Sequence, residues 1–280
     1  MSQATRKHYD QDVEFFQSFL DPYMKYTSGL FAGDGESLES AIARMLDLHL
    51  EFAGIKNGSR VLEIGSGWGA LIRRMSEKGM NVEYVGVSPS CVQNDFIANH
   101  FRYGRVSLHT KTFETSNFAK EAFDAVVLSG SFCHLQDKEA ELRRMGSLLK
   151  EGGRIVIEDT FFLSEELYRQ HARHPATQYV QREIFGFAEI LSWEAQLSMI
   201  LRNGFEIDRF VDHTSSYKKT IEIWIQNLHK LDEHRFPLKN DYIKYLGIAQ
   251  KGWGRTIGNY LVSLKRADIR QQPAEQVLVG

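Results

Sequence analysis

Cysteine, proline and net charge are all scarce in this sequence. Its 280 residues include 2 cysteines and 5 prolines, and the formal net charge is −2. Cys91 and Cys133 are far apart and form no CxxC pair, which argues against a zinc site or a disulfide framework and is typical of the reducing cytoplasm. A charge this small offers no general attraction to nucleic acids or anionic lipids. We therefore expect a cytoplasmic location, with no metal and no nucleic-acid partner.

Long apolar runs and low-complexity linkers are also missing. The opening residues, MSQATRKHYD, lack the apolar core of a secretory signal, and no stretch approaches the roughly 18 uninterrupted apolar residues of a transmembrane helix. The hydrophobic fraction of 42% and the charged fraction of 25% are ordinary for a globular protein. No internal repeat is present either, so the sequence predicts a single domain over residues 1–280. It leaves the oligomeric state open, and a homo-oligomer is compatible with it.

Short β-branched runs alternate with amphipathic segments along the middle of the chain. Strands and helices that alternate at these lengths predict an α/β fold with a mainly parallel sheet covered on both faces. The strands are expected within residues 59–67, 81–88, 105–110, 123–130, 154–160, 204–213 and 258–266. We divide the domain into a helical cap (1–55), a cofactor-binding core (56–160), a helical lid or acceptor region (161–203) and C-terminal strands and helices (204–270).

A glycine turn follows the first of these strands, in the run VLEIGSGWGAL. Gly65, Gly67 and Gly69 lie between a strand and a helix, where glycine allows a tight turn and a close approach to a ligand. In an open α/β sheet, ligands bind beyond the carboxyl ends of the strands. The acid Glu63 within the strand and the E-x-G-x-G-x-G spacing favour S-adenosylmethionine over the dinucleotides, whose binders use G-x-G-x-x-G. A bare turn with glycines for packing is the alternative interpretation.

The end of the second strand reads GVSPSCVQ, where most class I methyltransferases place an acid for the ribose hydroxyls. Ser88 occupies that position, and Gln93 follows five residues later. The flanks HYDQDVEFFQSFLDPYMKYTSGLF (8–31) and HTSSYKKTIEIWIQNL (213–228) resemble the cyclopropane-fatty-acid synthase and mycolic-acid methyltransferase family, which also uses a hydroxyl residue and a glutamine here. The resemblance covers nearly the whole chain and implies a Rossmann-like class I methyltransferase fold, with a seven-stranded sheet and a helical lid inserted after the fifth strand.

The resemblance also implies which residues bind S-adenosylmethionine. The cofactor-binding positions are Tyr26 and Thr27 at its methionine end, Gly65 and Gly67 at its amino-acid part, Ser88 and Gln93 at the adenosine, Ser129 and Gly130 after the fourth strand, and Glu63 beside the glycine turn. The residues that stack on adenine are expected within TKTFETS (110–116), with no single one assigned.

Family members that methylate unreactive alkenes hold a bicarbonate ion as the base, and this sequence departs from their pattern. Ser28 stands at the position of the cysteine that holds the ion, Cys133 at that of a glutamate, and Glu158 at that of a histidine. Only the fourth holder, a tyrosine, remains, as Tyr217. We therefore expect no bicarbonate.

The fifth strand, in GGRIVIEDT (152–160), ends on two adjacent acids, Glu158 and Asp159. Glu158 is a candidate base or stabiliser of a cation, and the alternatives are pairing with an arginine or capping of the next helix. Because side chains alternate along a strand, Asp159 should point the other way and be structural. His134 is a second candidate base, with a purely hydrogen-bonded role as its alternative. Tyr217 is the third catalytic candidate and would orient the carboxylate or the substrate.

The acceptor is expected to be apolar, with Phe132, Phe161, Phe185 and Trp193 in segments that would wall its pocket. Together these features predict an S-adenosylmethionine-dependent C-methyltransferase for a hydrophobic, alkene-bearing small molecule. An isoprenoid or terpenoid intermediate of natural-product biosynthesis fits best, and cyclisation could follow methylation. The alternatives are a small-amine N-methyltransferase, a fatty-acyl or mycolate-type lipid methyltransferase, and a non-catalytic S-adenosylmethionine-binding partner of another enzyme.

Overall fold

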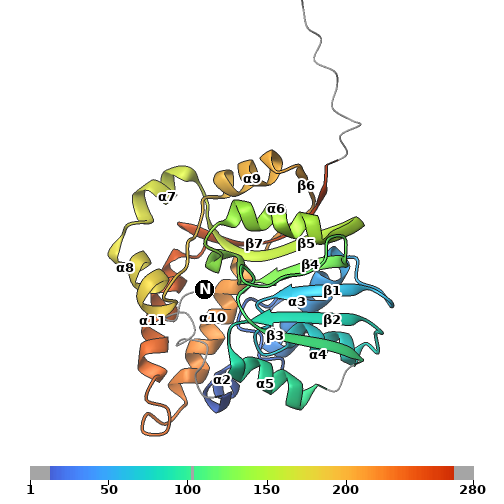
Figure 1. Ribbon diagram of the computed structural model, residues 1–280. Coiled ribbons are helices and arrows are strands. Elements are labelled where there is room, and N and C mark those ends of the chain that lie inside the picture. Colours follow the sequence, from blue (N-terminus) through green and yellow to red (C-terminus); the bar gives the residue numbers. More distant parts are fainter. Residues whose placement is uncertain (1–12, 102–103, 268–280) are drawn as a thin grey trace, which may run out of the picture.

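One seven-stranded sheet forms the centre of the computed structural model, which describes residues 13–101 and 104–267 (Figure 1). The strands are β1 (Arg60–Ile64), β2 (Glu83–Ser88), β3 (Arg105–Thr110), β4 (Phe123–Ser129), β5 (Leu149–Phe162), β6 (Phe205–Asp212) and β7 (Ile257–Arg266). They lie in the order β3-β2-β1-β4-β5-β7-β6. The first five strands pair in parallel, whereas β7 runs antiparallel to both β5 and β6. The expected class I methyltransferase fold is thereby confirmed.

Helices cover both faces of the sheet, and each face has its own apolar core. The larger core lies under α2 (Val13–Phe19), α3 (Leu38–Phe52), α4 (Ala70–Glu77), α10 (Thr214–His229) and α11 (Lys239–Gly252), and the other under α6 (Lys138–Leu148) and α9 (Trp193–Arg202). Successive strand residues supply opposite cores, since Val156 belongs to the first and Ile157 to the second. This alternation decides which face receives each side chain at the end of β5.

The helix before β5 is shorter than its sequence suggests. The run KEAELRRMGSLLKEGG predicts a helix that its glycines close, but α6 ends at Leu148 and β5 begins at the next residue. Gly152 has a φ of +72°, which a helix cannot contain, and Leu149 already pairs with Phe123 of β4 across an irregular register. Pairing with the neighbouring strand therefore overrides the local helical pattern.

The segment between β5 and β6 is helical, as expected. It contains α7 (Glu165–His171), α8 (Pro175–Gln178), a π-helix, η2 (Tyr179–Ile184), and α9. The π-helix packs against α11, so this segment meets the C-terminal helices at one end of the sheet (Figure 1). Within the described ranges, no helix combines the length and apolarity that crossing a bilayer requires.

Candidate active site

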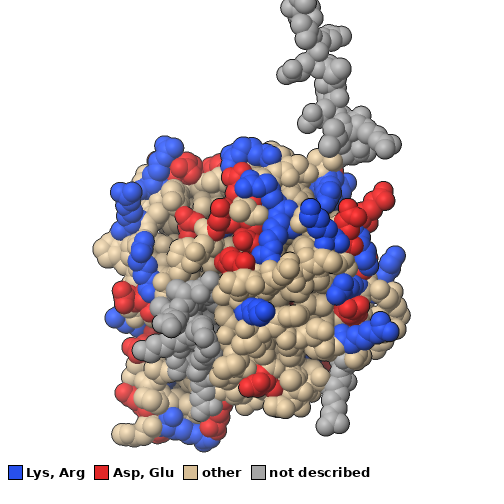
Figure 2. Space-filling model, viewed as in Figure 1, with Lys and Arg blue, Asp and Glu red and all other residues tan. Residues whose placement is uncertain are grey.

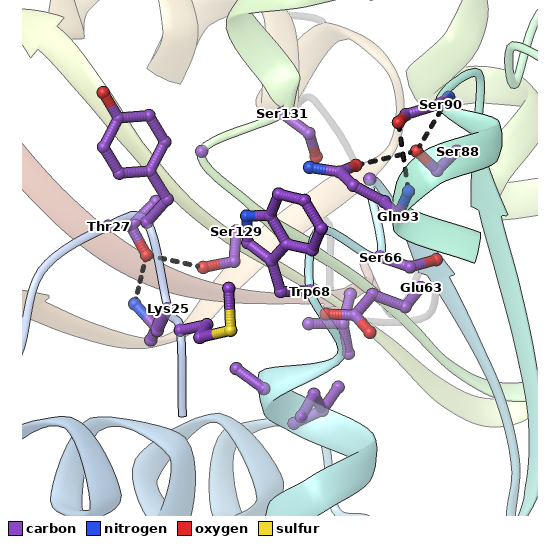
Figure 3. A pocket seen from close by; sticks show the side chains of 18 of the residues that line it. Lys25, Thr27, Glu63, Ser66, Trp68, Ser88, Ser90, Gln93, Ser129 and Ser131 are labelled. Carbon is purple, nitrogen blue, oxygen red and sulfur yellow. Dashed lines mark hydrogen bonds between the residues drawn. The ribbon is translucent and has the colours of Figure 1, made fainter. Parts of the chain in front are cut away.

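A pocket opens beyond the carboxyl ends of β1, β2 and β4, and we call it the cofactor pocket (Figure 3). All nine residues expected to bind S-adenosylmethionine line it: Tyr26, Thr27, Glu63, Gly65, Gly67, Ser88, Gln93, Ser129 and Gly130. α5 (Cys91–His100) contributes Gln93, while Tyr26 and Thr27 belong to the loop after α2. The fold therefore brings these positions together, and their individual roles stay predictions.

The glycine turn after β1 leaves space for a ligand at one of its glycines. Gly65 and Gly67 have φ angles of +85° and +51°, a region that other residues rarely adopt. A Cβ added to Gly65 would lie 2.6 Å from the Cβ of Ser131, so this glycine is required by the protein itself. A Cβ added to Gly67 would meet no protein atom within 4 Å, although the residue lines the pocket. Among the glycines of this turn, Gly67 therefore has the open space that a close approach of the backbone to a ligand requires.

We expect Gly67→Val to weaken binding of S-adenosylhomocysteine by about 10- to 100-fold, because its branched side chain would project into space that the cofactor needs. Gly79→Val is a matched control, since Gly79 also has a positive φ (+62°) and open space around its Cβ but lies outside the cofactor pocket. Calorimetry should show weakened binding for the first variant only. Equal binding by the two variants would contradict this placement of the cofactor.

The polar groups of the cofactor pocket suit a ligand with both an ammonium and hydroxyl groups. Ser88 donates a hydrogen bond of 3.1 Å to Gln93 Oε1 and leaves the amide NH₂ group to serve as a donor. Burial raises the pKa of Glu63 to about 8, although a hydrogen bond from Tyr84 and the charge of Lys25 oppose this rise. A bound ammonium group would favour the ionised carboxylate. These features fit the amino-acid and ribose parts of S-adenosylmethionine.

A second pocket adjoins the first, and we call it the acceptor pocket. The two share Tyr26, Thr27, Gly130 and His134 as lining residues. All three catalytic candidates line the acceptor pocket: Glu158, Tyr217 and His134. The η2 helix and helices α10 and α11 supply an apolar wall, which comprises Val180, Tyr217, Ile221, Tyr245, Leu246 and Ala249. A hydrogen bond between the hydroxyls of Tyr26 and Tyr245 joins this wall to the loop after α2.

The aromatic residues expected to wall the acceptor pocket are only partly placed as predicted. Phe185 lines the pocket. Phe132 and Phe161 instead belong to the core between the sheet, α6 and α9, and Trp193 packs against Phe161 and Tyr260 with ring centroids 5.5 and 5.0 Å apart. The prediction was therefore wrong for these three. The local sequence indicates only that these side chains are buried, and buried aromatic residues are expected both in a core and in the wall of a ligand pocket.

Glu158 lies at the centre of a buried charge cluster. Lys25 Nζ contacts its two carboxylate oxygens at 3.0 and 2.7 Å, and His49 Nε2 lies 3.1 Å from Oε2. Ser129 donates to Oε2 at 2.6 Å, and Thr27 lies at 3.4 Å. The Glu158 residue is 0% exposed. The cluster ties the loop after α2 and helix α3 to the end of β5.

The surroundings of Glu158 make it a weak base. Burial alone would raise its pKa, but the ammonium of Lys25 and the imidazole of His49 more than compensate and hold the pKa well below its usual range. His49 Nδ1 lies 2.8 Å from the carbonyl oxygen of Met45, while Nε2 faces the carboxylate. The sequence analysis considered an ion pair between Glu158 and an arginine, and the structure shows such a pair with Lys25 instead. A catalytic role of Glu158 stays a prediction.

Asp159 lines the acceptor pocket together with Glu158, although strand alternation directs the two side chains to opposite faces of β5. Its two oxygens accept the backbone N–H groups of Cys133 at 2.9 Å and of Thr160 at 2.7 Å. Burial raises the pKa of Asp159 to about 6, against the effect of these N–H groups. Both oxygens are thus engaged in holding the loop after β4 to the end of β5.

His134 is buried where the two pockets meet, in the short helix η1 (Phe132–His134). Its Nδ1 lies 2.7 Å from the carbonyl oxygen of Phe187, so Nδ1 carries the proton of the neutral ring and Nε2 carries the lone pair. Burial lowers the pKa of His134 to about 4, although the Phe187 carbonyl opposes this and Lys138 adds to it. The ring is therefore neutral at physiological pH and able to accept a proton.

The positions that hold bicarbonate in the resembling family do not form one site here. Ser28 is fully buried, donates to the carbonyl oxygen of Gly29 at 2.6 Å, and lines neither pocket. Cys133, Glu158 and Tyr217 do line the acceptor pocket. Over the part of the chain that the structure describes, no three His, Cys, Asp or Glu side chains are grouped as metal ligands.

Lys25, His49 and Trp68 are among the site residues that sequence reasoning missed. Lys25 and His49 bind Glu158, and Trp68 projects into the cofactor pocket (Figure 3). Lys25 stands inside the motif DPYMKYTSGLF, so it could have been noticed as a cation among mostly apolar and aromatic residues. His49 gives no such signal, because a histidine within an amphipathic helix is common on either face.

Comparison with known proteins supports the resemblance. The family model described as mycolic acid cyclopropane synthetase matches residues 1–253. Cyclopropane mycolic acid synthase MmaA2 of Mycobacterium tuberculosis is 27% identical over 259 residues, which are 85% of this chain and 88% of that protein. Its solved structure has a TM-score of 0.85 to this chain at 23% identity, covering 94% and 97% of the two chains.

Two further solved structures share the fold. Coclaurine N-methyltransferase, bound to N-methylheliamine and S-adenosylhomocysteine, has a TM-score of 0.77 at 21% identity and covers 92% of this chain and 80% of its own. Geranyl diphosphate C-methyltransferase of Streptomyces coelicolor, in complex with Mg²⁺, geranyl diphosphate and S-adenosylhomocysteine, has a TM-score of 0.69 at 16% identity and covers 95% and 99%. With the family model spanning most of its length, the chain belongs to the mycolic acid cyclopropane synthetase family and is an S-adenosylmethionine-dependent methyltransferase.

Proposed function

We propose that this methyltransferase transfers a methyl group to carbon in a hydrophobic, alkene-bearing small molecule, with an isoprenoid as the substrate class. The observation that carries the proposal is the acceptor pocket, which has an apolar and aromatic wall and opens onto the cofactor pocket at Gly130 and His134. Such a wall excludes water from an apolar chain and presents ring faces to a cation. The altered bicarbonate positions distinguish this pocket from that of an enzyme making cyclopropanes in plain acyl chains.

The reaction requires a base as well as a methyl donor. S-adenosylmethionine supplies the methyl group, the alkene supplies the electron pair of the new carbon–carbon bond, and the neighbouring carbon becomes positive. The rings of Tyr217, Tyr245 and Phe185 line the pocket in which this charge develops. Loss of a proton from an adjacent carbon then restores a double bond. If another double bond of the substrate reacts with the cation first, a ring closes before the proton is lost.

His134 is the proton acceptor that the geometry favours. Its neutral ring lies at the junction of the pockets, and Nε2 holds the lone pair because Nδ1 faces the Phe187 carbonyl. Glu158 is held in an ion pair with Lys25, and both oxygens of Asp159 accept backbone N–H groups. In this mechanism Glu158 positions Thr27 and Ser129, which touch it from the cofactor pocket.

Methyl transfer from isotopically labelled S-adenosylmethionine tests the proposal. The purified enzyme is offered a prenyl compound, a cyclic amine and an unsaturated fatty-acyl chain, and product NMR identifies the methylated atom. A new carbon–carbon bond in the prenyl compound is the expected result. Exclusive methylation of nitrogen would favour an amine as the acceptor, with His134 accepting the amine proton. Coclaurine N-methyltransferase shares the fold of this chain. Exclusive methylation of the acyl chain would place the enzyme with its lipid-modifying relatives.

Turnover is expected to be independent of bicarbonate. Ser28 lies outside both pockets, and the carboxylate of Glu158 would repel the ion from the position where a histidine would hold it. Rates in degassed buffer and in buffer supplemented with bicarbonate should agree, at matched pH and ionic strength. A strong rise in rate on adding bicarbonate would contradict the proposed role of His134 as the base.

A further inference from the structure

A third hollow lies beside the acceptor pocket and is not used by the mechanism above. It is bordered by α7, α8 and η2, and it shares Gln181, Ala188 and Ile190 with the acceptor pocket. Its volume of about 420 Å³ compares with about 110 Å³ for the acceptor pocket. The hollow therefore has room for a bulky, hydrated group attached to a ligand in the acceptor pocket.

Arginine dominates the charged lining of this hollow. Its charged lining residues are Arg169, Arg173, Arg182 and Glu189. Blue side chains are visible along the edge of the molecule that α7 and α8 form (Figure 2). Arginine presents a planar set of donors that matches two oxygens of a phosphate group. The side chains here thus suit an anion that carries several oxygen atoms.

Two carboxylates beside the hollow, Glu189 and Glu165, are already paired with cations. Glu189 binds Lys138 at 2.9 Å, and Glu165 of α7 binds Arg169 at 3.3 Å. Arg182 donates a hydrogen bond of 2.6 Å to the neutral side chain of Gln178, and no ion pair of Arg173 or Arg182 is found within residues 13–101 and 104–267. Among the described residues, Arg173 and Arg182 therefore have no carboxylate within ion-pair distance.

We infer that this hollow receives the phosphate or diphosphate head group of a prenyl acceptor whose hydrocarbon chain lies in the acceptor pocket. The inference rests on the proposed function, because it names the substrate class of the same site. Gln181, which is 7% exposed, lies in the wall common to the two compartments. An amphipathic molecule can thus span both, with its charged end toward Arg173 and Arg182 and its apolar end toward His134.

The test compares geranyl diphosphate with geraniol, which has the same chain and no anionic group. Variant R173Q/R182Q removes both of these guanidinium groups. Variant R143Q/R202Q is a control that removes the same amount of charge from two exposed arginines of α6 and α9 outside the hollow, both of which pair with Glu139. We expect kcat/KM for the diphosphate to fall about 10- to 100-fold in R173Q/R182Q, the range for two charge-assisted contacts. The rate with geraniol, and both rates in the control, should stay unchanged. An equal loss for the two substrates in R173Q/R182Q would overturn the inference.

A binding measurement separates this inference from the proposed function. Inorganic pyrophosphate is titrated into the enzyme saturated with S-adenosylhomocysteine, without any acceptor. Saturable binding of pyrophosphate that is weaker in R173Q/R182Q and unchanged in R143Q/R202Q is the expected result. It supports the head-group site even if no prenyl compound is methylated. Absence of pyrophosphate binding by the native enzyme overturns it even if geraniol is methylated. Binding to vesicles with an anionic phospholipid, but not to pyrophosphate, also overturns the assignment to a small-molecule head group.

Discussion

Lys25→Met and Glu158→Gln are each expected to destabilise the enzyme, and the double variant is expected to recover most of the loss. Removing one partner of a buried ion pair leaves an uncompensated polar or charged group in the interior, at a cost of about 3–5 kcal/mol. That loss corresponds to a decrease in Tm of roughly 10 °C for a chain of this size. Both side chains are at most 4% exposed, so solvent offers little relief. Replacing both removes the unpaired charge together with its partner.

Thermal melts of the four proteins give the coupling between Lys25 and Glu158 directly. Lys265→Met is the control, because Lys265 pairs with Glu206 at 3.0 Å but both side chains are more than 40% exposed, and exposed pairs contribute about 1 kcal/mol or less. The same proteins test the catalytic role that the sequence suggests for Glu158. A double variant that is stable and binds S-adenosylhomocysteine yet has lost all turnover would make Glu158 a catalytic residue. Recovery of turnover along with stability would make it a positioning residue.

His134→Asn is expected to reduce turnover by about 10²- to 10⁴-fold, the usual contribution of a general base. The asparagine amide can still donate to the Phe187 carbonyl from the place of Nδ1, whereas Nε2 is lost. Affinity for S-adenosylhomocysteine should therefore change little. Cys133→Ala, a substitution in the same helix and the same pocket, should retain most of the activity. Near-normal turnover by His134→Asn would remove His134 from the mechanism.

The pH dependence of this variant provides an independent measurement. Because burial lowers the pKa of His134 to about 4, the native enzyme should keep its base in the neutral form down to that pH. The unfolded chain binds this proton near pH 6.5, so it holds more protons than the native state between about pH 6.5 and 4. The contribution of His134 to stability is therefore lost as the pH falls through this window. Chemical unfolding at several pH values should show a smaller decrease for His134→Asn.

Much of the fold follows from local properties of the sequence. Strand β3 is found at the expected residues, 105–110, and strands β2 and β4 differ from the expected ranges only at their ends. Runs of β-branched residues between glycines and amphipathic segments determine these elements without reference to distant parts of the chain. The same holds for the cofactor pocket, since its glycine turn and the Ser88–Gln93 pair are contained in short motifs at the ends of β1 and β2.

The charge state of the site could not be predicted in this way. Lys25 and Glu158 are 133 positions apart, and they meet only because the loop after α2 crosses the end of β5. His49 joins them from α3, on the face of the sheet to which Glu158 points. Whether an acid at a strand end is a base or half of an ion pair depends on which cations packing brings near it. The sequence alone allowed both.

The sequence by itself therefore determined most of the strands and the glycine turn at Gly67, because backbone conformation and hydrophobic period are encoded within a few residues. The other positions expected around the cofactor pocket came from the resemblance to a known family. Tertiary structure decided the rest. It placed Phe132 and Phe161 in the core, paired Lys25 with Glu158, and set the arginine-lined hollow beside the acceptor pocket. Burial, ion pairing and the pKa values that result from them are sums over neighbours distant in the chain, so they exist only once the chain has packed.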